Sequence, residues 1–376
     1  MKRSKTPRNE YFRYQVLLWR IVGALDISEG NYWSWAMLLN FFVYFSTVLL
    51  IMSLFSYENP IDNFSLTIIS FATLVRLLLY AAQLTKLVEI EELIGQLDGR
   101  VSGNDEVVHH QKMTKHMDRM SKLFLGLYVS VTVNIGISFL LKNERSLPLP
   151  MRVPFDWENS MAAYVWSLFL EEIAIFFQVM GNFAGDSFPP VALGLVSEQC
   201  QLLSLRISNL GYGSKTLKEN EEDLVNCIDD QNTLYSLLRQ IHSLISYPML
   251  VLIFVNGINI AIAGCALVFY VETLAQRVYY VCFLLAFAMQ TYPLCYYGTM
   301  VKENFAELHY AIFCSNWVDQ SAVFRRNMLI LAERTKREQR LFAGDLLPIH
   351  LSTFMACWKG AYSFFTLMAD RNARSS

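Results

Sequence analysis

The sequence predicts an all-α membrane protein with seven transmembrane helices, a cytosolic N-terminus, an extracellular C-terminus and a cytosolic layer of helices. The composition is the first reason, because 54% of the residues are hydrophobic and only 17% are charged. A soluble protein of this size carries nearer a quarter of charged residues. The second reason is that the apolar residues form seven blocks of 18 to 24 residues. Each block is long enough to cross a hydrocarbon core of roughly 30 Å.

The blocks are predicted to be helices because a bilayer offers no water to an unpaired backbone group. Strands of a membrane barrel are about half as long and alternate in polarity, which these blocks do not. A soluble protein with seven buried helices is the alternative, but soluble helices carry a polar stripe. The predicted spans are Trp35–Tyr57, Phe64–Leu84, Leu123–Leu141, Met161–Phe183, Tyr247–Tyr270, Val278–Tyr297 and Leu351–Met368.

The distribution of basic residues predicts the orientation. The N-terminus and the loops after the second, fourth and sixth spans together carry 23 Lys and Arg residues, whereas the opposite side carries 6. The positive-inside rule therefore places the N-terminus in the cytosol and the C-terminus outside. The basic opening MKRSKTPR is not followed by a short apolar run with a cleavage site, so the first span is expected to remain as an anchor.

Long loops on the cytosolic side are expected to be helical. Apolar residues recur every three or four positions in LGLVSEQCQLLSLRISNLG, in DLVNCIDDQNTLYSLLRQIHSLI and in FAELHYAIFCSNWV. The acidic run Glu219–Asp223 is interpreted as a solvated loop tip. The expected layout is a cytosolic segment at 1–34, spans one to four at 35–184, cytosolic extensions of helices four and five at 185–246, spans five and six at 247–297, a further cytosolic segment at 298–350, and the last span with an extracellular C-terminus at 351–376.

Four charged residues fall inside the predicted spans, at depths of roughly 12–18 Å: Arg76, Glu171, Glu172 and Lys359. A charge at such a depth costs about 2.5–3.5 kcal/mol on insertion scales, so it faces a partner or water. The two acids and two bases could pair or could line an aqueous vestibule. Snorkelling or a purely structural pair is the alternative.

One face of the last span is polar. Lys359, Ser363, Leu367 and Arg371 recur at a spacing of four, which places them on one side of a helix. Such a stripe suits a water-filled axis with a hydrophobic constriction at Leu367. A face that packs in the protein interior would explain the same pattern.

The extracellular halves of the second, third, fourth and sixth spans contain an apolar and aromatic set with a few hydroxyl groups, which is the composition of a pocket for a small organic molecule. Ordinary core packing is the alternative. The candidate residues are Ile69, Ala72, Thr73, Asn134, Ile137, Tyr164, Ser167, Leu168, Tyr280 and Phe283.

Enzymatic motifs are not found in the sequence. No H-E-x-x-H, G-x-S-x-G or P-loop occurs, and the histidines lack a carboxylate cluster at ligand spacing. We therefore expect neither an enzyme nor a metal or other cofactor. The basic stretch RRNMLILAERTKREQR abuts a membrane span, so anionic lipid explains it better than nucleic acid does.

Three segments resemble signatures of the insect odorant receptor family. The stretch YYGTMVKENFAELHYAIFCSNW is similar to the signature that leaves the sixth helix of that family. KGAYSFFTLM is similar to the motif of its last helix, and GDSFPPVALGLVSEQCQLLSLRISNLG looks like its fourth-helix extension. The residues that match the first signature are Gly298, Asn304, Ala311, Phe313, Ser315 and Trp317.

The resemblance implies a function. It implies that this chain is a tuning subunit, not the co-receptor, and that it assembles with a common co-receptor into a heterotetrameric, odorant-gated, non-selective cation channel in the plasma membrane of olfactory sensory neurons. It implies that the segment 298–350 anchors the subunits to one another, and that the outer part of the last helix lines the pore. The spacing-four stripe then places Lys359 on or near the conduction path. Small volatile molecules are expected to bind among helices two, three, four and six. One departure is Gln231, where the family usually has histidine.

Three other interpretations remain open at this point. A gustatory receptor of the same superfamily would assemble without the co-receptor. A G-protein-coupled receptor would have an extracellular N-terminus, and neither D-R-Y nor N-P-x-x-Y occurs. A transporter that uses the four intramembrane charges as a relay would be expected to contain inverted repeats, and the sequence shows no internal repeat.

Overall fold

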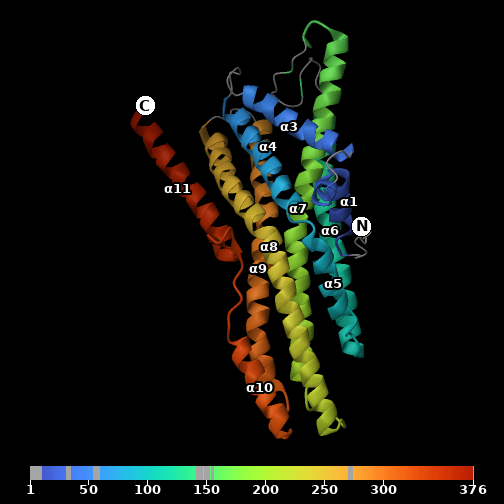
Figure 1. Cartoon of the computed structure of the whole chain (residues 1–376). Helices are drawn as coiled ribbons and strands as arrows, with labels where there is room; N and C mark the ends of the chain where they lie inside the picture. Colours follow the sequence, from blue (N-terminus) through green and yellow to red (C-terminus); the bar gives the residue numbers. More distant parts are fainter. Residues whose placement is uncertain are drawn as a thin grey trace.

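The computed structural model is an elongated bundle of long helices that run side by side (Figure 1). It describes residues 11–30, 35–53, 60–140, 147, 153, 156–269 and 274–375. The helices in this part of the chain are α1 Arg13–Ile21, α2 Ala24–Ser28, α3 Trp35–Ser53, α4 Pro60–Ala81, α5 Lys86–Asp98, α6 Asn104–Leu140, α7 Met161–Ser208, α8 Leu217–Phe269, α9 Leu274–Cys314, α10 Ala322–Thr335 and α11 Leu351–Ser375. A two-residue antiparallel pair, β1 Phe342–Ala343 and β2 Leu347–Pro348, precedes α11.

The prediction of seven helical spans is confirmed, because the predicted blocks lie on α3, α4, α6, α7, α8, α9 and α11. Residues 54–57, 141 and 270, at the ends of three blocks, lie outside the described residues. In the described part, α4, α7, α8 and α9 each contain a stretch long and apolar enough to cross a membrane, and α3 contributes a shorter apolar stretch, Tyr44–Ser53.

Three helices are much longer than a membrane is thick. α7, α8 and α9 have 48, 53 and 41 residues, which corresponds to about 60–80 Å at 1.5 Å per residue. Their apolar repeats continue beyond the predicted spans, as the sequence indicates, so the helices continue as well. Figure 1 shows α7, α8 and α9 along the length of the molecule, with α10 at one end and α11 at the edge of the bundle.

The acidic run at the start of α8 is helical, so its interpretation as a loop tip is wrong. The hydroxyl of Thr216 accepts a hydrogen bond from the backbone N–H of Glu219 at 3.3 Å, and the Glu219 carboxylate accepts one from the N–H of Thr216 at 2.7 Å. This capping box satisfies two backbone donors at the helix start. The acids lie in the first turns, where the helix dipole favours negative charge.

The main hydrophobic core surrounds α7. Side chains from Phe183 to Val196 are buried, including the two prolines Pro189 and Pro190 inside the helix. A Cβ at Gly194 would lie 3.1 Å from atoms of Met117 on α6 and of Tyr297 on α9. The absence of a side chain there lets three helices approach one another.

The N-terminal segment belongs to this core, which the sequence did not predict. Phe12 and Trp19 are fully buried, and their rings lie 5.0 and 5.1 Å from the ring of Phe188 on α7. Gln15 is also buried and donates a hydrogen bond to Ser187 at 3.0 Å. The segment before the first span is therefore a packed layer.

An ionic cluster joins the ends of α5, α6, α7 and α8 beyond the predicted spans. Arg206 lies 2.8 Å from both Glu106 and Asp230, and Arg100 lies 2.9 Å from Asp230. Burial raises the pKa of the Asp230 carboxyl, and the two arginines counteract that effect. The cluster fixes four segments against one another at this end of the bundle.

The β1–β2 pair positions the start of α11. The side chain of His242 on α8 lies 2.9 Å from the carbonyl oxygen of Phe342, and the N–H of Gly344 donates to Ser246 at 2.9 Å. Gly344 has φ +56, and a Cβ there would lie 2.4 Å from Leu250. The strand pair therefore attaches to the middle of α8 immediately before the chain enters its last helix.

Candidate functional site

Two of the predicted pocket residues lie in one apolar cluster. Ile69 on α4 and Phe283 on α9 pack against a core of Ile260, Phe287 and Ala361. The rings of Phe283 and Phe287 meet edge to face at 4.6 Å. Ala261, Leu284 and Trp358 complete this cluster, which we call the α11 contact cluster. It joins the candidate pocket directly to the last helix.

The remaining pocket candidates on α4 are buried by their neighbours within the protein. Ala72 and Thr73 are buried. The Thr73 hydroxyl lies 2.8 Å from the carbonyl oxygen of Ile69 and 3.0 Å from the side-chain oxygen of Asn182 on α7. Thr73 therefore ties α4 to α7, and its hydroxyl already has partners.

The candidates on α7 and α9 differ in their environments. Ser167 is fully buried, and its hydroxyl has no hydrogen-bond partner among the described residues. Tyr164 and Leu168 are half-buried, and the Tyr164 ring lies 6.3 Å from that of Trp157. Tyr280 is half-buried next to Tyr279, at 5.3 Å between ring centroids. These four residues are not members of the α11 contact cluster in the described contacts.

Two further candidates cannot be placed by their side chains. Asn134 and Ile137 belong to α6, but their side chains lie outside the described residues. The structure thus brings Ile69 and Phe283 together, and it places the others on α4, α6, α7 and α9 as the sequence predicts.

The four intramembrane charges do not pair with one another. Arg76 forms an ion pair with Asp186 of α7, and the two side chains are 7% and 0% exposed. Glu171 is fully buried, Glu172 is half-buried and Lys359 is exposed. Asp186 is not among the predicted intramembrane charges because it lies three residues beyond the predicted end of the fourth span. An aspartate within a turn of a span boundary was the available signal.

The predicted polar stripe faces away from the rest of the chain. Lys359, Ser363 and Leu367 are exposed, with Leu367 at 65%, and the side chain of Arg371 lies outside the described residues. The opposite side of α11 contacts the bundle through Cys357, Trp358 and Ala361. No described residue of the same chain covers the stripe.

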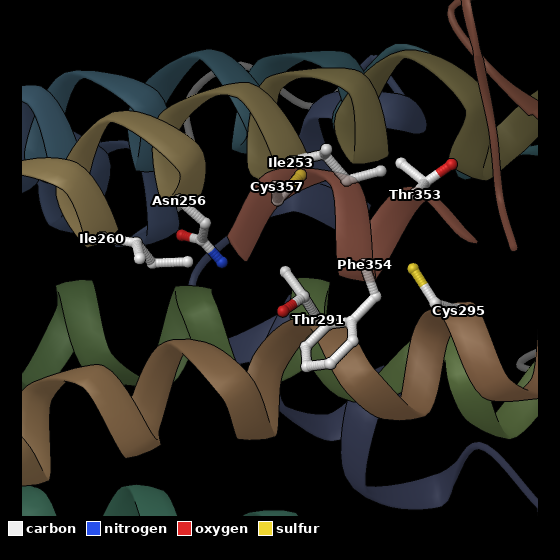
Figure 2. Close-up of a pocket in the computed structure, with 8 residues that line it drawn as sticks. All are labelled: Ile253, Asn256, Ile260, Thr291, Cys295, Thr353, Phe354 and Cys357. Carbon is white, nitrogen blue, oxygen red and sulfur yellow. The ribbon is translucent and has the colours of Figure 1, made fainter. Parts of the chain in front are cut away.

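A small cavity lies where α11 meets α8 and α9 (Figure 2). Its volume is about 10 Å³, which is about the space that one water molecule needs. It is too small for an organic ligand and lies apart from most of the predicted pocket. The residues that line it are Ile253, Asn256, Ile260, Thr291, Cys295, Thr353, Phe354 and Cys357.

Comparisons with known proteins identify the family. The family model described as 7tm Odorant receptor matches residues 56–362. The chain belongs to the odorant receptor family. It is 60% identical to Odorant receptor 23a of Drosophila melanogaster, with 100% of both chains covered, and 32% identical to Odorant receptor 59a of the same species, with 96% of both covered.

The fold of this odorant receptor matches that of solved insect receptors. The olfactory receptor OR5 of Machilis hrabei aligns with a TM-score of 0.77 at 15% identity, covering 96% of this chain and 99% of the other. The same receptor in complex with eugenol aligns with a TM-score of 0.78 at 16% identity, covering 96% and 100%. The chain is a multi-pass membrane receptor and not an enzyme.

Large apolar side chains are exposed on this receptor at the far end of α9 and on α10. Tyr310, Phe313 and Val318 are 72%, 58% and 59% exposed, and Leu329 and Ile330 are 64% and 51% exposed. These five residues, which we call the anchor surface, lie beyond the predicted spans. Large apolar side chains that are exposed outside a membrane are candidates for contact with another protein.

Gln231, where the family usually has histidine, is fully buried in α8. Neither its side-chain oxygen nor its nitrogen has a hydrogen-bond partner among the described residues. Among the described residues, the Gln231 amide is therefore buried without a hydrogen-bond partner.

Proposed function

We propose that this chain is the odorant-binding subunit of a heterotetrameric, odorant-gated, non-selective cation channel that forms with a common co-receptor. The observation that carries the proposal is the α11 contact cluster, in which Ile69 and Phe283 from the candidate pocket pack with Trp358 and Ala361 of the last helix. Family membership and the 60% identical relative, which is named an odorant receptor, support it.

The proposed ligand is a small volatile molecule with a polar group. The candidate pocket supplies aromatic and aliphatic walls through Phe283, Tyr280 and Ile69. Ser167 adds a buried hydroxyl without a partner among the described residues, and such a group gains when a ligand oxygen accepts its hydrogen bond. Eugenol, which the solved Machilis receptor binds, has this chemistry and is the first probe to try.

The proposed pore is lined by the polar stripe of α11. Lys359 and Ser363 are exposed on the side of α11 that its own bundle leaves uncovered, and Leu367 on the same side would form the hydrophobic constriction. Arg371 continues the stripe in the sequence. We expect Lys359→Gln to change conductance or ion selectivity in single-channel recordings. A variant with unchanged conductance, selectivity and odorant response would contradict this role.

The proposed layout places residues 185–246 and 298–350 in the cytosol, with the N-terminus, and the C-terminus outside the cell. The anchor surface at Tyr310, Phe313, Val318, Leu329 and Ile330 would contact neighbouring subunits, because it is apolar and lies beyond the spans. The proposed location is the plasma membrane of olfactory sensory neurons, and the basic residues beside α10 would contact anionic lipid.

Whole-cell current tests the function. Cells expressing this chain with and without the co-receptor would be exposed to eugenol and to a panel of esters, ketones, alcohols and aromatic volatiles. We expect a non-selective cation current that needs both subunits and an odorant. Current from this chain alone would favour the gustatory type of assembly. Silence together with failure to co-purify with the co-receptor would refute the proposal.

A matched pair of variants tests the pocket. Phe283→Ala removes a ring that packs between the candidate pocket and α11, whereas Phe254→Ala removes a ring of α8 that is 66% exposed. We expect Phe283→Ala to raise the half-activating odorant concentration by about tenfold, since the half-buried ring would lose about 1.4 kcal/mol of contact with the ligand. Phe254→Ala should leave it unchanged. Equal effects of the two variants, after correction for receptor at the surface, would exclude Phe283 from the pocket.

A further inference from the structure

A series of hydrogen-bonded polar side chains, each buried or half-buried, crosses the bundle from α4 to α8, and we call it the polar series. It begins at Arg76, whose guanidinium donates to one oxygen of Asp186 on α7. The hydroxyl of Tyr128 on α6 donates to the other oxygen of Asp186. The two oxygens of one buried carboxylate thus hold three helices together.

Two side-chain amides continue the polar series. The side-chain nitrogen of Gln290 on α9 donates to the Tyr128 hydroxyl oxygen at 3.0 Å. The side-chain nitrogen of Asn256 on α8 donates to the Gln290 oxygen at 3.2 Å. Each group in the series donates in the direction of Asp186, so the position of each side chain orients the next. Five helices are connected in the order α4, α7, α6, α9 and α8.

The polar series ends where the last helix, α11, packs against α8 and α9. Asn256 lines the small cavity together with Thr353, Phe354 and Cys357 of α11. In Figure 2 the Asn256 amide points from α8 toward α9, and the Phe354 ring of α11 points toward the same space. Gln290 is adjacent in sequence to Thr291, which also lines the cavity.

The polar series contains more hydrogen-bonding groups than the buried Arg76–Asp186 ion pair needs. Arg76 and Asp186 already neutralise each other, and Asn182 and Tyr128 supply further hydrogen bonds to the pair. The two amides extend away from the charges through spans that are otherwise apolar, where polar groups are rare and usually functional. Because a hydrogen bond weakens steeply beyond about 3.5 Å, a shift of α9 by about 1 Å would break the series.

We propose that Tyr128, Gln290 and Asn256 are positioning residues that couple α4, α6 and α7, which carry pocket candidates, to α8 and α9, on which the pore helix α11 rests. The inference rests on the proposed channel function. The hydrogen bonds exist in one relative position of the two helix groups, so they bias the equilibrium between closed and open channels.

Two tyrosines provide the test. Tyr128→Phe removes the hydroxyl that links Asp186 to Gln290, so it loses two hydrogen bonds. Tyr80→Phe removes a hydroxyl that donates to the Gly185 carbonyl at 2.9 Å and joins no two members of the series. Both variants keep the ring. Gln290→Met, which breaks the two amide links, is a second variant for the case that Tyr128→Phe fails to reach the surface.

The readout is the ratio of maximal odorant-evoked current to spontaneous current, recorded with the co-receptor and with the panel odorant that is most effective on the unsubstituted receptor. Surface biotinylation corrects for receptor amount. We expect Tyr128→Phe to reduce this ratio roughly two- to tenfold, the factor that corresponds to one net hydrogen bond, and Tyr80→Phe to leave it unchanged. The double variant with Gln290→Met should be no worse than Gln290→Met alone, since both substitutions break the same series.

The outcomes separate this inference from the function on which it rests. No evoked current from the unsubstituted receptor with the whole panel, together with failure to co-purify with the co-receptor, would overturn both. A normal current from it, with equal ratios for Tyr128→Phe and Tyr80→Phe or with additive effects of Tyr128→Phe and Gln290→Met, would overturn the coupling role alone.

Discussion

The buried ion pair of Arg76 and Asp186 allows a quantitative prediction for Asp186→Asn. The arginine and aspartate side chains are 7% and 0% exposed, so neither charge is solvated by water. Replacing the carboxylate by an amide of nearly the same shape leaves the guanidinium buried without a counter-charge. Removal of one partner of a buried pair costs about 3–5 kcal/mol. We therefore expect the free energy of unfolding of Asp186→Asn to fall by that amount.

The assay is thermal unfolding of the purified receptor complex in detergent, combined with the amount of receptor at the cell surface. The double variant Arg76→Gln with Asp186→Asn removes both charges and should recover part of the loss, because no unpaired charge remains. Asp223→Asn is the control, since Asp223 pairs with Lys215 at the surface, with side chains 36% and 57% exposed, and should change stability by less than about 1 kcal/mol. The reasoning is refuted if Asp186→Asn is as mild as the control, or if the double variant is as unstable as Asp186→Asn.

Two further predictions concern packing. Gly298→Ala would place a Cβ 2.2 Å from the backbone oxygen of Ile349, so the segment before α11 must move away from α9. We expect thermal unfolding to show a loss of about 1–3 kcal/mol in the free energy of unfolding. The control is Gly257→Ala on α8, whose Cβ would meet nothing within 4 Å and which should be neutral or stabilising. Gln231→Leu removes a fully buried amide without partners among the described residues and should stabilise the receptor by about 1–3 kcal/mol. Asn304→Leu is the control, because the Asn304 amide donates to Ser197 at 2.7 Å and its loss should destabilise the receptor. Equal effects of the two leucine variants on stability would contradict the prediction.

The number and positions of the seven spans could be predicted because they depend on local pattern. An apolar block of about 20 residues must be helical in a bilayer whatever its neighbours are, and a repeat of three or four residues continues a helix beyond it. The capping box at Thr216 and Glu219 was also readable, but the charge of Glu219–Asp223 was given more weight than the helix start. The packing of Trp19 against Phe188 could not be predicted, because it joins residues far apart in the sequence.

For the candidate site, the sequence could predict which helix carries each residue, but not which residues come together. Ile69 and Phe283 join one cluster through the relative rotation of α4 and α9, which no pattern within either helix determines. Asp186 was excluded by a boundary three residues too early. Asn256 and Gln290 were visible as single amides in apolar blocks, and polar residues at such positions are functional candidates by default. Neither amide belongs to the predicted pocket or to the predicted polar stripe, because the link between them depends on how α8 and α9 pack.

The two faces of α11 explain how binding and conduction can be carried by one helix. The α11 contact cluster and the polar series both reach the bundle-facing side of α11, between Thr353 and Ala361. Lys359, Ser363 and Leu367 lie on its exposed side. The helix rises about 1.5 Å per residue and moves as one body over such a short distance, so a displacement at Phe354 or Trp358 also displaces Lys359. A ligand that shifts Phe283 by a fraction of an ångström would therefore change the proposed pore without contacting any residue that lines it.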